Sequence, residues 1–309
     1  MKKIALLFAG QGSQTVGMGH DLCERLECCR DLFECANDIL GRDLRKICFD
    51  GPETLLTQTD NAQPGILLVS LVCLAALQEQ APDFAFGAAA GLSLGEFSAL
   101  TAAETFSFED GLRLIQQRGR FMQDACNTTS GIMASIIGMD DAALVEVCRE
   151  ADVDVANLNC PGQTVISGAK DKIAKAVELA KTRGAKRAIP LQVAGAYHSR
   201  LMQSAQDKLA SALSEVAMKT PFVTVVHNVT ARPANGAGEI KELLVRQVTS
   251  SVRWTESMQW LVGEGYTRFI ELGPGNVLSG LMKRINKDVE VLNVSDSASL
   301  DATVAKLIA

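Results

Sequence analysis

The fold is decided by residues 84–95, which read FAFGAAAGLSLG. The first seven of these residues form a mostly apolar run, typical of a strand buried on both faces, and residues 97–103 are predicted to continue as a helix. The turn between them, GLSLG, matches the pattern G-x-S-x-G, in which a tight turn exposes a serine hydroxyl at the end of a strand. The bare pattern would also suit a serine that caps a helix, but its position between a strand and a helix favours Ser93 as a nucleophile.

Further apolar runs and helical segments alternate along the chain. Residues 4–9 and 268–272 are also predicted to be buried strands, and each is followed by a glycine-rich turn. This alternation predicts an α/β fold with a mostly parallel sheet and helices on both faces. The other elements predicted for this part of the chain are helices at residues 21–40, 61–80, 108–125, 201–216, 239–247, 255–264 and 277–285 and strands at residues 222–227 and 290–294.

One internal segment has a different order of elements. The sequence predicts strands at residues 132–139, 153–158, 164–167 and 187–193 and helices at residues 141–150 and 170–183. The order βαββαβ is that of a ferredoxin-like unit. We therefore expect a small subdomain at residues 127–196, inserted into a large domain made of residues 1–126 and 197–309.

A serine nucleophile needs a base, and the chain contains three histidines. His20 lies at the start of the first predicted helix. His227 ends an apolar strand, where it could be a core histidine with satisfied hydrogen bonds. His198 follows a predicted strand and precedes a predicted helix, the position at which sites form in α/β sheets. The residues alone favour His198 only modestly.

A second glycine-rich turn, residues 10–14, follows the first predicted strand. It could aim a backbone N–H group into the same crevice as the serine. The N–H groups of Gln11 and of Leu94, which follows the nucleophile, would then form an oxyanion hole. A plain turn between a strand and a helix explains residues 10–14 equally well.

One arginine lies on an apolar helix face. Arg118 shares this face of the predicted helix with Leu114, Ile115, Phe121 and Met122. A guanidinium in such a place needs a partner. It could be a clamp for a substrate carboxylate, a head group that snorkels to the surface, or a member of an internal ion pair.

Composition and charge argue against several classes of protein. A net charge of -6 disfavours nucleic acid as a partner. Nine cysteines without a C-x-x-C pair favour reduced core thiols over a metal site. The longest apolar stretch, residues 66–77, is too short to cross a membrane, and the N-terminal apolar run lacks a cleavage-like site. We expect a soluble, cytoplasmic, monomeric protein with no metal, no cofactor and no membrane partner.

Seven motifs together resemble the malonyl-CoA:acyl carrier protein transacylase family over essentially the whole chain. They are FAGQGSQ at residues 8–14, GLSLGE at 91–96, QRG at 117–119, NCPGQ at 159–163, GAYHS at 195–199, VRQ at 245–247 and ELGPG at 271–275. The resemblance implies a hydrolase-like α/β core with the ferredoxin-like subdomain. It also implies transfer of a malonyl group from malonyl-CoA to the phosphopantetheine thiol of acyl carrier protein, through a malonyl-serine intermediate, in fatty acid biosynthesis.

The resemblance assigns roles to individual residues. It implies that Ser93 is the nucleophile, that His198 is the base and that Arg118 holds the malonyl carboxylate. It further implies that the main-chain carbonyl of Gln247 orients the imidazole, so that no triad carboxylate is needed.

The same family pattern assigns the oxyanion hole to Gln11 and Leu94 and adds Asn159 and Tyr197 to the substrate-binding residues. An aromatic residue just before the histidine resembles the malonyl-selective pattern of related polyketide acyltransferases. The chain departs from the family pattern beside the reacting serine, where the change bears on the acyl group accepted or on the rate, and at two other positions. The departures are Leu92 for histidine, Ala9 for proline and Asn276 for lysine.

Three alternatives remain open. A serine thioesterase or other hydrolase would share the elbow and the histidine, but it has no use for a buried cation such as Arg118. A non-catalytic carrier-binding subunit would not need Ser93 and His198. A trans-acting polyketide or malonate-decarboxylase acyltransferase would use the same chemistry on another carrier. Docking of an acidic carrier would need a local basic patch, for which the candidates are Lys186, Arg187, Arg200, Lys283, Arg284 and Lys287.

Overall fold

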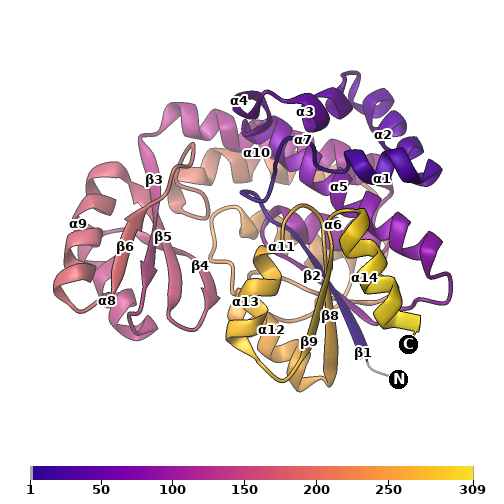
Figure 1. Ribbon diagram of the computed structural model, residues 1–309. Helices are drawn as coiled ribbons and strands as arrows, with labels where there is room; N and C mark the ends of the chain where they lie inside the picture. Colours follow the sequence, from indigo (N-terminus) through magenta and orange to yellow (C-terminus); the bar gives the residue numbers. More distant parts are fainter. Residues whose placement is uncertain (1–2, 309) are drawn as a thin grey trace.

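The computed structural model describes residues 3–308, which form two sheets flanked by helices (Figure 1). The larger sheet has the strand order β7-β2-β1-β8-β9, and every neighbouring pair is parallel, which confirms the predicted parallel sheet. Its strands are β1 (Lys3–Phe8), β2 (Ala88–Gly91), β7 (Thr224–Val226), β8 (Tyr266–Leu272) and β9 (Glu290–Val294).

The central strand β1 shows why both faces of this sheet are covered. Successive side chains of a strand point to opposite faces. Leu6 and Phe8 pack in one apolar cluster, whereas Ala5 and Leu7 pack in another. Helices on the first side are α2 (Glu27–Leu40), α5 (Thr59–Gln80), α6 (Leu94–Ala102), α7 (Phe108–Thr128), α10 (Gln203–Ser214) and α11 (Ala237–Gln247), and those on the second are α12 (Trp254–Gly263) and α13 (Val277–Ile285).

The smaller sheet has four antiparallel strands in the order β4-β5-β3-β6. Along the chain its elements follow the predicted βαββαβ order, and Figure 1 shows them as a separate unit beside the larger sheet. Two backbone hydrogen bonds between β4 and Val252 connect the two parts. The elements are β3 (Gly131–Ile137), α8 (Asp141–Ala151), β4 (Asp154–Cys160), β5 (Gln163–Ala169), α9 (Lys170–Thr182) and β6 (Arg187–Pro190).

Several boundaries differ from the prediction. The helix predicted at residues 21–40 is interrupted at Leu26, whose backbone is extended, so α1 (His20–Arg25) is separate from α2. The strand predicted at residues 84–90 begins only at Ala88, and the rings of Phe84 and Phe86 in the segment before it stack on each other. Elements that were not predicted are α3 (Leu44–Asp50), α4 (Glu53–Leu56) and α14 (Ser297–Ile308). The helix predicted from residue 201 begins with a 3-10 helix, Arg200–Met202.

The long helix α5 extends beyond the apolar stretch at residues 66–77 that was predicted to be too short for a membrane span. By length and composition alone this helix could cross a membrane. However, 89% of its most apolar stretch is buried inside the protein, so it is a core helix. It begins two residues earlier than predicted, which makes Pro64 its sixth residue. Because proline has no N–H, the carbonyl of Asp60 lacks its helical donor and accepts a hydrogen bond from Arg42 at 2.7 Å.

All nine cysteines lie within residues 3–308 and are free thiols. Most are buried, and burial raises the pKa of thiols such as Cys48 and Cys73 to about 12. They therefore stay protonated and pack as small apolar groups. Among residues 3–308, no group of three or more histidine, cysteine, aspartate or glutamate side chains could hold a metal ion.

Candidate active site

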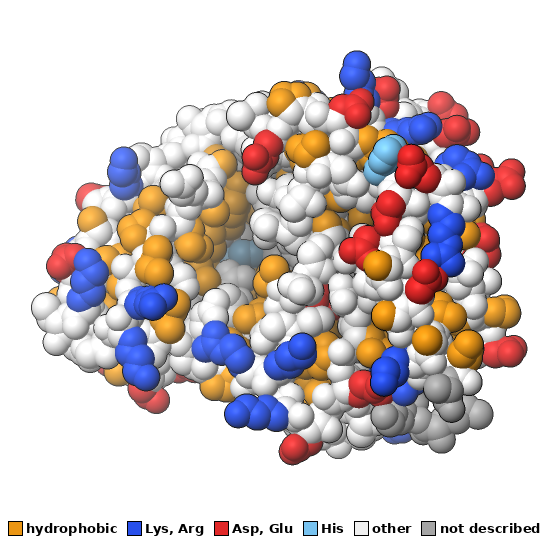
Figure 2. Space-filling view, viewed as in Figure 1, with side chains coloured by type: hydrophobic (Ala, Val, Ile, Leu, Met, Phe, Trp, Pro, Cys, Tyr) orange, Lys and Arg blue, Asp and Glu red, His pale blue; other side chains and the backbone are white. Residues whose placement is uncertain are grey.

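A cleft of about 600 Å³ opens beyond the carboxyl ends of β1 and β2, where β3, β4 and β5 of the smaller sheet form its opposite wall. Figure 2 shows this hollow between the two parts of the molecule, with apolar side chains along its walls. The carboxyl ends of parallel strands are where α/β folds place their sites. The cleft is lined by five of the predicted site residues, which are Gln11, Ser93, Asn159, Tyr197 and His198.

Ser93 stands on a strained turn between β2 and α6. Its φ of 55° and ψ of -107° form a combination that residues other than glycine rarely adopt. The flanking glycines permit this turn, because a Cβ on Gly91 would lie 1.9 Å from the backbone of Gly95 and a Cβ on Gly95 would lie 2.2 Å from the carbonyl oxygen of Phe8. The strand–turn–helix context predicted from the sequence is therefore present.

The structure brings Ser93 and His198 together, although they are 105 residues apart in the chain. Ser93 Oγ lies 2.8 Å from His198 Nε2, and His198 Nδ1 lies 2.9 Å from the carbonyl oxygen of Gln247. A carbonyl can only accept, so Nδ1 carries the proton and Nε2 is left to accept the serine proton. Burial, and then the charge of Arg118, lowers the pKa of His198 to about 4. The imidazole is therefore neutral at neutral pH and able to act as a base.

The two predicted oxyanion donors follow the carboxyl ends of β2 and β1. Leu94 is the first residue of α6, so its N–H is one of the four in the first turn that have no acceptor within the helix. Gln11 follows β1, lines the cleft and accepts a hydrogen bond from Gln63 at its side-chain oxygen. Their role as a pair of oxyanion donors stays a prediction.

Arg118 lies beneath the floor of the cleft on α7, with 1% of its surface exposed. Nη1 donates to Gln63 Oε1 at 2.8 Å. Nη2 donates to Ser93 Oγ and to Gln247 Oε1, both at 3.0 Å. The guanidinium also lies over the ring of Phe97, 5.4 Å from its centroid. This burial excludes the interpretation that the side chain snorkels to the surface.

The charge of Arg118 is unusual because its hydrogen-bond acceptors are neutral. Burial lowers the pKa of the guanidinium to about 10, so it still carries its charge at neutral pH. Its Nε has no hydrogen-bond partner among residues 3–308. A buried cation without a directly bonded anion has a strong tendency to bind one. The floor of the cleft is thus suited to a substrate that carries a carboxylate.

Tyr197 and Asn159 both line the same cleft. The Tyr197 hydroxyl bonds Thr59 Oγ1 at 2.8 Å, which fixes the ring beside His198. Burial raises the pKa of this phenol to about 12, so it stays neutral. Asn159 comes from β4, and its side-chain oxygen is buried without a partner within the described residues. Both side chains are therefore in position to contact a substrate.

A buried polar network behind the serine was not predicted. Asn228 Oδ1 accepts the Ser93 N–H at 2.7 Å. Glu96, which is completely buried, accepts hydrogen bonds from His227 and Gln247. His227 is thus the core histidine that the sequence had allowed. A signal was present, since Glu96 closes the serine motif and His227 and Asn228 are adjacent.

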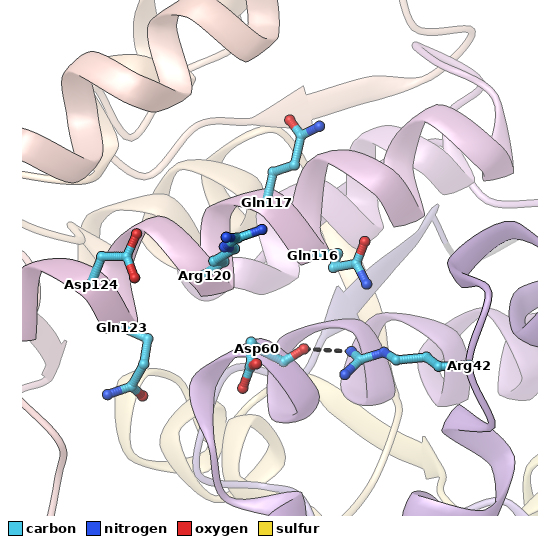
Figure 3. Close-up of a pocket in the computed structure, with 7 residues that line it drawn as sticks. All are labelled: Arg42, Asp60, Gln116, Gln117, Arg120, Gln123 and Asp124. Carbon is cyan, nitrogen blue, oxygen red and sulfur yellow. Dashed lines mark hydrogen bonds between the residues drawn. The ribbon is translucent and has the colours of Figure 1, made fainter.

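A second, polar pocket of about 420 Å³ lies between α5, α7 and the loop before α3 (Figure 3). The dashed line in Figure 3 marks the hydrogen bond from Arg42 to the carbonyl of Asp60. Asp124 forms an ion pair with Lys208. The pocket shares Gln123 with the cleft but contains neither the serine nor the histidine, so we do not assign the reaction to it. Its lining residues are Arg42, Asp60, Gln116, Gln117, Arg120, Gln123 and Asp124.

Lysine and arginine side chains gather around the lower and left rim of the hollow in Figure 2, where few acidic side chains are visible. Two of the six predicted patch residues are bound within the protein. Arg200 pairs with Asp152 and Asp154, and Arg284 donates to Gln163 and to the carbonyl of Pro161. Arg200 is therefore the weakest of the candidates for contact with an acidic partner.

The serine, bonded to a neutral histidine in a cleft at the carboxyl ends of the strands, is the arrangement of a nucleophile and its base. In agreement with this, residues 5–304 match the profile of the acyl transferase domain, and the chain belongs to that family.

Within the family, the chain is similar to proteins named for one substrate. It is 44% identical to the malonyl CoA-acyl carrier protein transacylase of Bacillus subtilis (strain 168), with 99% of this chain and 98% of that protein covered. The acyl-carrier-protein-S-malonyltransferase of Bartonella henselae has a TM-score of 0.95 and 39% identity, covering 99% of this chain and 100% of that one. A malonyl-transacylase in complex with a type II polyketide acyl carrier protein has a TM-score of 0.95 and 38% identity, covering 98% and 99%.

Proposed function

We propose that the protein transfers a malonyl group from malonyl-CoA to the phosphopantetheine thiol of an acyl carrier protein, through a malonyl-serine ester, in fatty acid biosynthesis. The observation that carries this proposal is the buried charge of Arg118, 3.0 Å from Ser93 Oγ. A cation in this place supports binding of a substrate carboxylate while the serine attacks the thioester. Relatives that are named malonyl transacylases and match nearly the whole chain support the same substrate.

In the first half-reaction, Ser93 Oγ attacks the thioester carbonyl while His198 Nε2 takes its proton. The developing oxyanion accepts hydrogen bonds from the N–H groups of Gln11 and Leu94. The carbon–sulfur bond then breaks, and His198 returns the proton to the departing coenzyme A thiol. The product is a malonyl ester on Ser93, with its carboxylate held by Arg118.

In the second half-reaction, the carrier's phosphopantetheine thiol occupies the place that coenzyme A has left. His198 takes the thiol proton, the sulfur attacks the ester carbonyl, and the Ser93 oxygen leaves with that proton. The carbonyl of Gln247 keeps the imidazole in one orientation through both steps. A neutral carbonyl suffices there because the imidazolium exists only briefly and lies near the oxyanion.

The proposed reaction can use either of two kinds of carrier protein. A fatty acid carrier is our proposal, and a polyketide carrier is the second candidate, because one structural neighbour was solved with a type II polyketide carrier. The enzyme can be incubated with malonyl-CoA and purified carriers of both kinds, and the mass gain of each carrier measured. Loading of the fatty acid carrier at a higher kcat/KM supports the proposal, and the reverse order overturns it. Release of free malonate faster than loading would indicate a hydrolase.

We further propose that the protein works as a cytoplasmic monomer and needs neither a metal nor a cofactor. The buried apolar surface of α5 and the reduced state expected of nine free thiols support that location. Each proposed chemical step uses only serine, histidine, arginine and backbone groups.

The pH dependence of serine acylation should follow His198. Only the neutral imidazole accepts the serine proton, and its pKa is lowered to about 4. The rate should therefore change little between pH 8 and about pH 5 and fall tenfold per unit well below pH 4. Since Arg118 contributes to the lowered pKa, Arg118→Gln should shift the acid limb to higher pH. Rapid-quench acylation by acetyl-CoA between pH 3.5 and 8 measures both effects, and an unshifted limb contradicts the coupling.

Discrimination against an α-methyl group should depend on Tyr197. Its ring is fixed beside His198 by the bond to Thr59, so it crowds the space next to the acyl carbon. Wild type should prefer malonyl-CoA over methylmalonyl-CoA by roughly 10- to 100-fold, the scale of one methyl group in a close pocket. Tyr197→Ser should lose most of this preference, whereas Tyr197→Phe, which keeps the ring, should retain it. Equal kcat/KM values for both substrates in wild type would exclude this role.

A further inference from the structure

The buried carboxylate of Glu96 is not used by the proposed mechanism. It lies in the first turn of α6, three residues after the serine, and is 0% exposed. Oε1 accepts from His227 Nδ1 at 2.7 Å. Oε2 accepts from Gln247 Nε2 at 2.7 Å and from the backbone N–H of Asn228 at 3.0 Å. Burial of a carboxylate at this depth is costly unless donors satisfy it, as they do here.

The contact with Gln247 helps to fix the direction in which that side-chain amide points. Its NH₂ group faces three acceptors, of which Glu96 Oε2 at 2.7 Å is the nearest, followed by the carbonyl of Ser93 at 2.9 Å and Asn228 Oδ1 at 3.4 Å. Its Oε1 therefore faces Arg118 Nη2 at 3.0 Å. A flipped amide would set NH₂ against the guanidinium, donor against donor, and an oxygen against these acceptors. The hydrogen bonds in this chain therefore all have the same direction, since Arg118 donates to Gln247 and Gln247 donates to Glu96.

The serine turn is held by Asn228, so an effect of Glu96 on the turn can be separated from its effect on Gln247 and Arg118. Asn228 holds the turn with its side chain, through Oδ1 to the Ser93 N–H and through Nδ2 to the Gly91 carbonyl, both at 2.7 Å. The Glu96 carboxylate bonds the backbone N–H of Asn228 and not the side-chain amide that holds the turn. Loss of the Glu96 acceptor should therefore disturb Gln247 and Arg118 more than the nucleophile.

We propose that Glu96 is a positioning residue for malonyl selectivity, acting through Gln247 to aim the Arg118 guanidinium at the substrate carboxylate. The inference rests on the proposed function and deepens it. In this role Glu96 acts as a hydrogen-bond acceptor for Gln247, and its negative charge is not required. The rate of Ser93 acylation by a substrate without a carboxylate should then change little when this acceptor is lost.

The test compares Glu96→Met, which keeps the volume but removes the acceptor, with Glu96→Gln. A glutamine at this position can still accept from Gln247 while His227 takes its other tautomer and accepts from the new NH₂. Rapid-quench mass spectrometry then measures acylation of Ser93 by malonyl-CoA and by acetyl-CoA. Glu96→Met should lower the malonyl-to-acetyl ratio by roughly 10- to 100-fold, the scale of one hydrogen bond to a charged group. Glu96→Gln should keep that ratio within about threefold.

Other results overturn the inference. An equal fall of both rates in Glu96→Met would mean that the residue supports only the serine turn. An equal fall of the ratio in both variants would mean that charge, not orientation, is what matters. Thermal melting shows whether Glu96→Met is folded. If it is not, Gln247→Met removes the middle member of the same chain of hydrogen bonds. A wild-type malonyl-to-acetyl ratio in Gln247→Met overturns the proposal. Wild type without any malonyl adduct would instead refute the proposed function.

Discussion

Ser93→Ala should lose malonyl transfer by about 10⁵-fold or more, the scale seen when the nucleophile of a serine enzyme is removed. Without Oγ, no ester can form on the turn between β2 and α6, and His198 and Arg118 each lose a bonding partner. Intact-mass analysis after mixing with malonyl-CoA should show a malonyl adduct on wild type and none on the variant. The fold should persist, because the turn depends on Gly91, Gly95 and the side chain of Asn228.

Ser98→Ala provides the matched control for this experiment. Ser98 lies on the same helix, is fully buried, and its hydroxyl has no hydrogen-bond partner among residues 3–308. The same atom is therefore removed a few residues from the site without breaking a bond, and loading should remain at the wild-type rate. An adduct that survives in Ser93→Ala would place the nucleophile elsewhere. A loss of activity in both variants would indicate damage to α6 rather than chemistry.

Local patterns were sufficient for the elements with strong signals. The serine turn was predictable because its backbone needs glycine at two fixed positions, and those glycines are visible in the sequence. The parallel sheet was predictable because strands such as β1 are nearly continuous apolar runs. Helix α14 was missed because it buries little beyond Leu300 and Thr303, so its apolar periodicity is weak. The interruption at Leu26 depends on packing and leaves no local signal.

The site was only partly predictable for a related reason. Family resemblance pointed to Ser93, His198 and Arg118, but the bonds among them join residues 25 and 105 positions apart. The orientation of the Gln247 amide, and the dependence of Arg118 on it, arise from the packing of α6, α7 and α11. The sequence placed Glu96 at the end of the serine motif but gave it no role. Its complete burial, which makes it informative, is a property of the assembled fold.

Arg118→Ala should show whether the enzyme selects malonyl groups by their charge. A malonyl carboxylate that enters this partly dry cleft loses water and must regain a charged partner. Removing one partner of a buried charge pair costs on the order of 2–5 kcal/mol, so kcat/KM for malonyl-CoA should fall by roughly 30-fold to several thousand-fold. Acetyl-CoA has no carboxylate, and its slow transfer should be preserved or improved. Steady-state transfer of both acyl groups to the carrier measures the ratio of the two kcat/KM values.

That ratio separates loss of the clamp from loss of the fold, because a misfolded variant loses both activities together. Arg113→Ala is the matched control on the same helix, since Arg113 is exposed and paired only with Glu109. It should behave as wild type. Arg118→Lys keeps a charge but not the planar pair of donors, and it should recover only part of the malonyl preference. If Arg118→Ala retained the wild-type preference, the carboxylate would have to bind elsewhere in the cleft, and Arg118 would serve only to hold Ser93, Gln63 and Gln247 in place.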